Sequence, residues 1–236
     1  MLTDKLKKRA RTVFFFTIFV FSCSMGFSQL SNTQKTLRIK LWAPIDENPI
    51  SKIVPKEDEP YYVTSINALK KTAPFLLSGM IYGWEYEYTP SDKTRNVEEY
   101  FSFVPIAEIS ENDRNITFTD PAFLEARVYC WLEYLRSEKM MAYLQRWNSV
   151  KYPKVFGFGE SSKIDSVEAI KEAVKEAAKN AIRTYAQKQT KNKPKEVSGK
   201  ILLCPEDPSI KILNGKYTTY LDFFLYVDKI VQYSQY

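Results

Sequence analysis

The sequence predicts a single α+β domain, in which an antiparallel or mixed sheet of about five to seven strands is packed by about three helices. Three observations carry this prediction. Several runs alternate apolar and polar residues, which is typical of half-buried strands. Other segments repeat apolar residues at helical spacing. An Asn214-Gly215 pair between two apolar runs is typical of a β-hairpin turn, because both residues tolerate positive φ.

The first 28 residues predict export. A cluster of basic residues precedes an apolar run over 12–21, and Gly26 and Ser28 lie just before Gln29. This order is typical of a signal peptide, so 1–28 is expected to be removed and 29–236 to form the domain, in the periplasm or outside the cell. Two alternatives are an uncleaved anchor and a lipid anchor on Cys23, since the preceding residues are similar to a bacterial lipobox.

Removal of the leader also changes the charge. The whole chain has 34 Lys and Arg against 28 Asp and Glu, a net charge of +6, and the leader holds five of the basic residues and one acid. The remaining domain has 29 against 27, a net charge of +2. A nucleic-acid partner is therefore not expected.

No segment after Gln29 is apolar enough to span a membrane.

In the N-terminal half, the alternation over Thr36–Trp42 predicts a strand, and the four prolines of 43–60 predict an exposed connection. A short helix is expected to begin at Thr64 or Ser65, with Pro74 kinking or restarting it. The runs Tyr82–Tyr88 and Glu98–Ile106 predict a hairpin with a long loop.

In the middle of the chain, Asp120–Trp147 predicts a long buried helix. Asp120 would cap it, Pro121 suits its first position, and apolar residues recur at helical spacing. The apolar residues are Leu124, Val128, Trp131 and Leu135. A short strand at Asn115–Thr117 is expected before this helix and a connection at 151–160 after it.

The C-terminal third predicts one helix and three strands. Asp165 would cap a helix with an apolar stripe that includes several alanines, which implies close packing on a neighbouring layer. Strands are expected at 200–204, 210–213 and 216–227, the last apolar enough over 220–227 to be an inner strand.

The inventory of reactive residues disfavours common catalysis. The chain contains no histidine, which removes imidazole acid–base catalysis, Ser-His-Asp and Cys-His systems and histidine-bound zinc. No cofactor is expected. An enzyme that acts on cell-wall or extracellular polysaccharide through two carboxylates is the alternative, with candidates on the predicted hairpin. These candidates are Glu85, Glu87, Glu98 and Glu99, and a solvated outer face is the simpler interpretation.

Two loops have weak ligand-binding patterns. Residues 111–115 are rich in oxygen donors but lack the central glycine and terminal glutamate of an EF-hand, so a solvated turn is favoured. Gly157 and Gly159 precede a helix, but neither a third glycine nor a Gly-Lys-Ser/Thr ending follows. Neither a metal site nor a nucleotide site is expected.

Aromatic residues gather in the predicted hairpin. Trp84, Tyr86 and Tyr88 share one face of a strand whose other face carries Glu85 and Glu87. Exposed, these rings would stack on sugars or on a protein partner. Because the glutamates already serve as the solvated face, we favour buried rings, and the binding role stays the alternative.

Cys130 and Cys204 remain after the leader is removed, either as a disulfide in an oxidising compartment or as two buried thiols. Together these features favour a non-catalytic envelope or secreted protein that binds a protein or glycan partner. The alternatives are the carboxylate enzyme and a structural subunit of an envelope assembly. No resemblance to a known family is evident.

Overall fold

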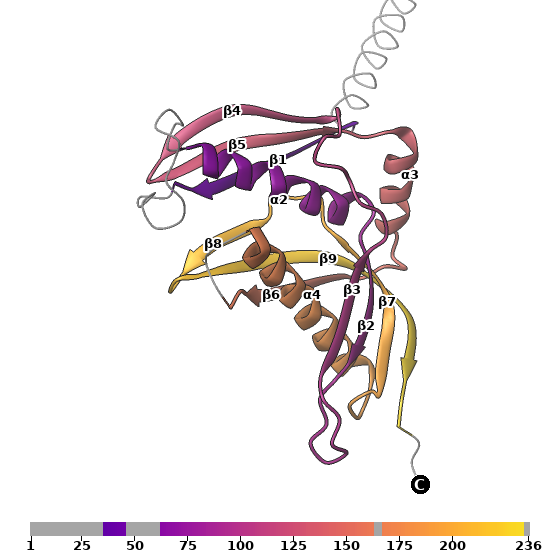
Figure 1. The fold of residues 1–236 in the computed structure, drawn as a ribbon. Coiled ribbons are helices and arrows are strands. Elements are labelled where there is room, and N and C mark those ends of the chain that lie inside the picture. Colours follow the sequence, from indigo (N-terminus) through magenta and orange to yellow (C-terminus); the bar gives the residue numbers. More distant parts are fainter. Residues whose placement is uncertain (1–34, 46–61, 163–166, 234–236) are drawn as a thin grey trace, which may run out of the picture.

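The computed structural model describes residues 35–45, 62–162 and 167–233. The predicted signal peptide, Cys23 of the lipobox-like motif, the predicted helix cap at Asp165 and most of the proline-rich connection lie outside the described residues. Within them the chain forms three helices and nine strands in two antiparallel sheets. The α+β class is thus confirmed, with the strands divided between two sheets (Figure 1).

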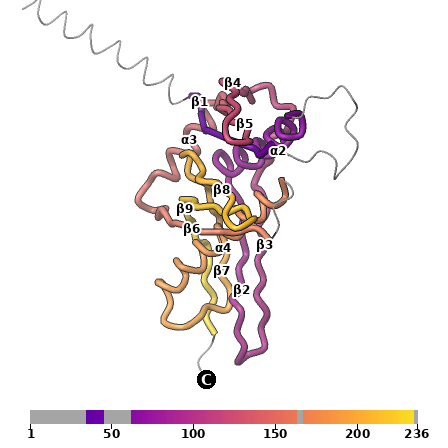
Figure 2. The backbone as a smooth tube through the Cα atoms, turned by 90° about the vertical axis from the view of Figure 1, so that its left-hand side faces the viewer, coloured from indigo at the N-terminus to yellow at the C-terminus, as the bar shows by residue number. Residues whose placement is uncertain are grey.

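The smaller sheet has the strand order β1-β5-β4. Its strands are β1 (Thr36–Pro44), β4 (Ile116–Leu124) and β5 (Arg127–Leu135). The predicted strand at the N-terminus is confirmed as β1, where every second side chain, beginning with Leu37, is buried. This sheet lies at one end of the elongated molecule (Figure 2).

The larger sheet has the order β3-β2-β7-β9-β6, with β8 paired to β9 beside β7. Its strands are β2 (Trp84–Thr89), β3 (Tyr100–Pro105), β6 (Lys154–Glu160), β7 (Glu196–Leu203), β8 (Ser209–Leu213) and β9 (Lys216–Val231). The two predicted hairpins are confirmed as β2–β3 and β8–β9. Asn214 and Gly215 both have positive φ at the second turn, and β9 is an inner strand.

Helix α2 (Val63–Ile81) lies between the two sheets, in contact with β1 and β5 on one side and with β7 on the other (Figure 1). The predicted cap is wrong, because Ser65 donates its hydroxyl to the Pro44 carbonyl at 2.7 Å. The helix also continues through Pro74 without a restart. Proline has no amide hydrogen to donate to the Lys70 carbonyl, so one helical hydrogen bond is missing at this turn.

The predicted long helix over Asp120–Trp147 is wrong. The segment forms the β4–β5 hairpin and then helix α3 (Glu138–Trp147), which Ser137 caps. In β5 the residues Val128, Cys130, Leu132 and Tyr134 are buried in strict alternation, so a two-residue period decides the structure. The helical spacing of the apolar residues was incidental.

The Asp-Pro pair read as a helix start is instead a β-bulge. The register of β4 shifts between Thr119 and Ala122, and Asp120 has a φ of 51°. Pro121 fits here because β4 is an edge strand, where a missing amide breaks no ladder hydrogen bond. The short strand predicted at 115–117 is the beginning of β4.

Helix α4 (Val167–Gln189) packs on β6 and β9, and all of its alanines are buried, as the stripe predicted. The connection predicted at 151–160 is wrong, because most of it is strand β6. A Cβ on Gly157 would lie 2.1 Å from the Ala177 carbonyl oxygen, and one on Gly159 would lie 2.1 Å from that of Ala173. These glycines serve the close approach of helix to strand and do not form a phosphate-binding turn.

Candidate binding surface

The three aromatic residues predicted on β2 are core residues. Trp84, Tyr86 and Tyr88 are at most 2% exposed. The Trp84 ring stacks on Phe103 with centroids 4.7 Å apart, and Gly79 of α2 leaves the space that the indole fills. These rings therefore do not reach the surface, where a partner would bind. Their burial agrees with the interpretation that the sequence favoured.

The four glutamates of the β2–β3 hairpin have different surroundings. Glu85 makes an ion pair with Lys200 at 3.1 Å, and Glu87 and Glu98 are exposed. Glu99 accepts hydrogen bonds from Tyr88 and Lys179, both at 3.0 Å.

Burial of Glu99 alone would raise its pKa, but the Lys179 and Tyr88 hydrogen bonds outweigh that effect, so its pKa lies below the usual value. A general acid needs the opposite shift.

The oxygen-rich loop uses its own donors. Asp113 accepts from the Asn115 amide and side chain at 2.9 Å and from the Tyr134 hydroxyl at 3.0 Å. These bonds, led by the one from the Asn115 backbone, lower the pKa of Asp113. Among the described residues no group of three or more metal-ligating side chains comes together.

Cys130 and Cys204 are two buried free thiols in this structure, one on β5 of the smaller sheet and one directly after β7 of the larger sheet. Burial raises the pKa of Cys130 to about 11 and that of Cys204 to about 12. A thiol that stays protonated is a poor nucleophile, so neither suits catalysis.

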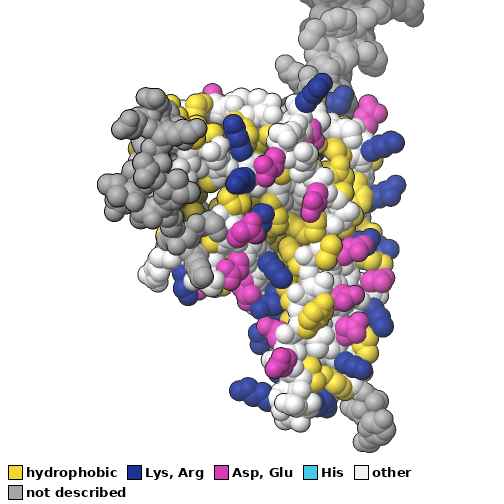
Figure 3. Space-filling model, viewed as in Figure 1, with side chains coloured by type: hydrophobic (Ala, Val, Ile, Leu, Met, Phe, Trp, Pro, Cys, Tyr) yellow, Lys and Arg dark blue, Asp and Glu magenta, His cyan; other side chains and the backbone are white. Residues whose placement is uncertain are grey.

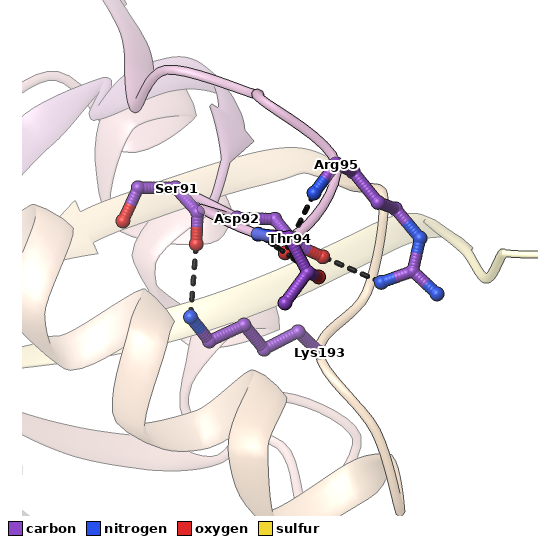
Figure 4. A network of polar contacts seen from close by, with 5 residues as sticks. All are labelled: Ser91, Asp92, Thr94, Arg95 and Lys193. Atoms are coloured by element: carbon purple, nitrogen blue, oxygen red, sulfur yellow. Dashed lines mark hydrogen bonds and ion pairs between the residues drawn. The ribbon is translucent and has the colours of Figure 1, made fainter.

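A polar network fixes the tip of the β2–β3 hairpin (Figure 4). Asp92 accepts from the Thr94 hydroxyl at 2.6 Å and from the Arg95 guanidinium at 2.6 Å, while Lys193 donates to the Ser91 carbonyl at 2.9 Å. The Thr94 and Arg95 bonds lower the pKa of Asp92 to about 2. The neighbouring cavity is about 20 Å³, room for one water and not for a ligand.

The outward face of the smaller sheet carries a row of stacked cations and rings. Arg38 lies over Trp131 at 4.3 Å, Lys40 over Tyr129 at 5.1 Å, and Arg127 over Trp42 at 4.4 Å, each measured to the ring centroid. We call these six residues the cation–ring face. They belong to β1 and β5 alone, and none of them was predicted to bind a ligand.

The register of the two strands builds this face. Lys40 is directly opposite Trp131, and Trp42 is directly opposite Tyr129. Each cation therefore contacts the ring that lies diagonally across from it on the neighbouring strand, two residues from its direct partner. Because three successive pairs repeat the same step, the cations and rings form a regular row along the sheet.

The charges of the row are unequally compensated. Arg38 makes ion pairs with Glu133 at 3.0 Å and with Asp120 at 3.1 Å, which the β4 bulge brings to this face. Within the part of the chain that the structure describes, the Lys40 ammonium and the Arg127 guanidinium have no carboxylate oxygen within 4.0 Å. Two cations are thus available to an anionic ligand, with Tyr129 and Trp42 between them.

The larger sheet holds this end of the row in place. The Trp42 indole donates to the Ile210 carbonyl of β8 at 3.0 Å, and the Lys40 backbone amide donates to Asp207 at 2.9 Å. Arg127 also donates to the Tyr129 hydroxyl at 3.4 Å. The Trp42 side chain is therefore held from outside the row, and the Arg127–Tyr129 hydrogen bond joins two members of the row to each other, which preorganises this end.

Elsewhere the surface charges are mixed. On the face shown in Figure 3, basic and acidic side chains are interspersed around β2, β3 and α4. Such mixing is typical of a solvated surface. The cation–ring face differs at Lys40 and Arg127, whose charged groups have no carboxylate partner among the described residues. No helix among the described residues has the length and apolar character needed to cross a membrane.

Comparison with known proteins places the chain in an uncharacterised family whose model matches residues 22–233, and the chain belongs to that family. It is similar to an uncharacterised protein of Treponema pallidum (strain Nichols), with 24% identity over 201 residues, which cover 85% of this chain and 83% of that protein. No solved structure matches.

Proposed function

We propose that the protein is a non-catalytic binding protein of the cell envelope or the exterior, and that it binds an acidic glycan through the cation–ring face. The observation that carries this proposal is the half of the row at Lys40 and Arg127, where two uncompensated cations flank the rings of Tyr129 and Trp42. A chain without histidine has no imidazole for acid–base or nucleophilic catalysis, which favours a binding role.

The chemistry of an acidic glycan matches this arrangement. The apolar C–H surface of a pyranose packs on aromatic rings, as other apolar groups do. Its carboxylate or phosphate groups accept charge-assisted hydrogen bonds from lysine and arginine, which are stronger than neutral ones. A regular row suits a repeating polymer, because successive sugars meet successive cations and rings.

The described residues give less support to the alternative function, an enzyme that acts on polysaccharide through two carboxylates. Glu99 is held by Lys179 and Tyr88 with a lowered pKa, and Glu85 is paired with Lys200. An inverting or retaining glycosidase requires one carboxyl group that is protonated at working pH. We therefore put binding ahead of hydrolysis.

Binding of polygalacturonate, in which every sugar carries a carboxylate, and of neutral dextran would test the proposal by isothermal titration. We expect binding of the acidic polymer that weakens with salt. Loss of a charge-assisted contact costs about 1.5–3 kcal/mol, so Lys40→Ala and Arg127→Ala should each weaken binding at least about tenfold. Circular dichroism would check that both variants fold.

Lys211→Ala is the matched control, because Lys211 also lies over a ring, Tyr220 at 5.8 Å, but on the larger sheet. It should leave binding unchanged. Equal losses in all three variants, or an acidic polymer that does not bind, would rule out the cation–ring face as the site. Stronger binding to a single-stranded oligonucleotide or to anionic vesicles would assign the face to another partner.

Export rests on the order of residues in the leader and is part of the same proposal. The protein isolated from its native cell should begin at Gln29, which mass spectrometry of the intact chain would determine. A lipid-modified form beginning at Cys23 would select the anchored alternative, and an intact leader on protein from the cytosol would exclude export.

A further inference from the structure

Among the residues that the structure describes, strand β6 pairs with β9 alone, so its other edge is open. Its pairing with β9 is bounded by hydrogen bonds at both ends, from the Leu225 amide to the Pro153 carbonyl and from the Ser161 amide to the Tyr217 carbonyl. Because antiparallel residues alternate in direction, the backbone groups of Lys154, Phe156 and Phe158 point away from β9. Of these groups, the Phe158 carbonyl accepts from Asn180 of α4 at 2.9 Å.

Exposed rings accompany this free edge. Phe156 is 58% exposed, and the neighbouring Phe158 and Tyr220 are each more than a third exposed. Tyr220 of β9 joins the two phenylalanines, with ring centroids 6.4 Å from Phe156 and 5.2 Å from Phe158. Natural edges are usually protected by charge, proline or a covering element, and an apolar unprotected edge is a pairing site.

The sequence of β6 is complementary to itself. It reads Lys-Val-Phe-Gly-Phe-Gly-Glu, so a two-fold rotation about Gly157 places Phe156 opposite Phe158 and Lys154 opposite Glu160. All four residues have outward backbone groups and share the face away from α4. The same rotation therefore matches donors with acceptors, rings with rings and opposite charges with each other.

We propose that two copies of the chain pair through β6, antiparallel, about a two-fold axis at Gly157, and that they join their larger sheets into one. Phe156 donates to and accepts from Phe158 of the partner subunit. The Phe158 carbonyl keeps its Asn180 bond, because a carbonyl oxygen has two lone pairs. Such an isologous contact closes on itself and does not propagate into fibres.

The charges at the new contact add little affinity, and the rings set the register. Lys154 already pairs with Glu206 at 2.9 Å and Asp222 at 3.1 Å, so Glu160 of the partner subunit adds little attraction. A pairing shifted along the strand would lose the Phe156–Phe158 contact.

Helix α4 supplies the rest of the interface. An open groove of about 750 Å³ runs between β6 and α4, and the charged residues that line it are all basic: Lys154, Arg183 and Lys188. Since α4 passes over Gly157 near Ala177 and Ala181, the rotation brings the basic end of the helix toward the half of the partner's helix that carries Glu168, Glu172 and Glu176. The groove is thus filled by the second helix.

Sedimentation velocity over a wide range of concentration would test the dimer. The full chain should sediment as a dimer, and Phe156→Lys should raise the dissociation constant at least about tenfold, because a lysine pair would be desolvated at the axis. The matched control is Phe123→Lys, which alters a similarly exposed phenylalanine, 52%, on β4. It should leave the dimer intact.

Disulfide trapping tests the register. Directly opposite residues of a hydrogen-bonded pair have Cα atoms about 5.5 Å apart, within disulfide range. An oxidised mixture of Phe156→Cys and Phe158→Cys proteins should therefore form cross-linked dimers in higher yield than either variant alone. The unaltered chain, oxidised in the same way, shows how much cross-linking comes from Cys23.

Three results would overturn the dimer proposal. They are a chain that is monomeric at every concentration, a dimer that Phe156→Lys does not weaken, and a cross-link that needs no pairing of the two variants. If the chain is a monomer and binds an added acidic peptide at the groove, the β6 edge is a binding site for a different partner and the dimer proposal is wrong.

Discussion

The two sheets use the same two-residue alternation to opposite effect. In β2 of the larger sheet the rings of Trp84, Tyr86 and Tyr88 point inward, whereas in β5 of the smaller sheet Tyr129 and Trp131 point outward. The difference lies in the residues between the rings, which are glutamates in β2 and apolar residues in β5. Whether an aromatic side chain in these strands is buried therefore depends on which of the two faces of its strand is the more apolar.

Substitution of one tryptophan in each sheet tests this comparison most strongly. Trp84→Ala removes a fully buried indole and should lower the free energy of unfolding by about 3–5 kcal/mol. Trp131→Ala removes a partly buried ring with one cation contact and should cost about 1 kcal/mol or less. Urea unfolding of both variants would measure the difference. Equal losses would mean that the outward face is as important to stability as the core.

The same comparison explains how much the sequence could predict. The α+β class, both hairpins of the larger sheet, β1 and α4 follow from alternation, turn residues and an alanine stripe. The β4–β5 hairpin was missed because its turn is Glu125-Ala126, and both residues adopt positive φ without the expected Asn or Gly.

The candidate face was missed for a related reason. Reading Val128 and Trp131 as one helical stripe put the indole in the core, although the residues from Val128 to Tyr134 alternate in a way that would have placed it outside. Only the β1 half of the row, with Arg38, Lys40 and Trp42, was visible as an alternating strand. The pairing register that joins the halves depends on contacts far apart in sequence.

Gly159 controls how closely helix α4 approaches the larger sheet. Gly159→Ala would place its Cβ 2.1 Å from the Ala173 carbonyl oxygen and 2.4 Å from the Ala177 amide, so α4 must move outward. We expect a loss of about 1–3 kcal/mol in the free energy of unfolding, as for an overpacked core.

Gly215→Ala is the control for the backbone effect alone. Gly215 has a φ of 72°, and a Cβ added there would have no atom of the described residues within 4 Å. Only the cost of positive φ, about 1 kcal/mol, therefore applies. A Gly159→Ala variant no less stable than Gly215→Ala would mean that α4 adjusts without cost, and the explanation of the glycines as spacers for the helix would be wrong.

The smallest effect is expected where the smaller sheet departs from ordinary turn chemistry. Ala126 closes the β4–β5 hairpin at a φ of 55°, a conformation that glycine adopts without strain and alanine does not. Ala126→Gly should therefore stabilise the chain, by about 0.5–1 kcal/mol in thermal or urea unfolding. The stacking of Arg127 over Trp42 depends on the register between β1 and β5, which this turn does not connect, so the variant should leave binding by the cation–ring face unchanged. A destabilised Ala126→Gly protein would show that the alanine methyl group makes contacts that outweigh the strain.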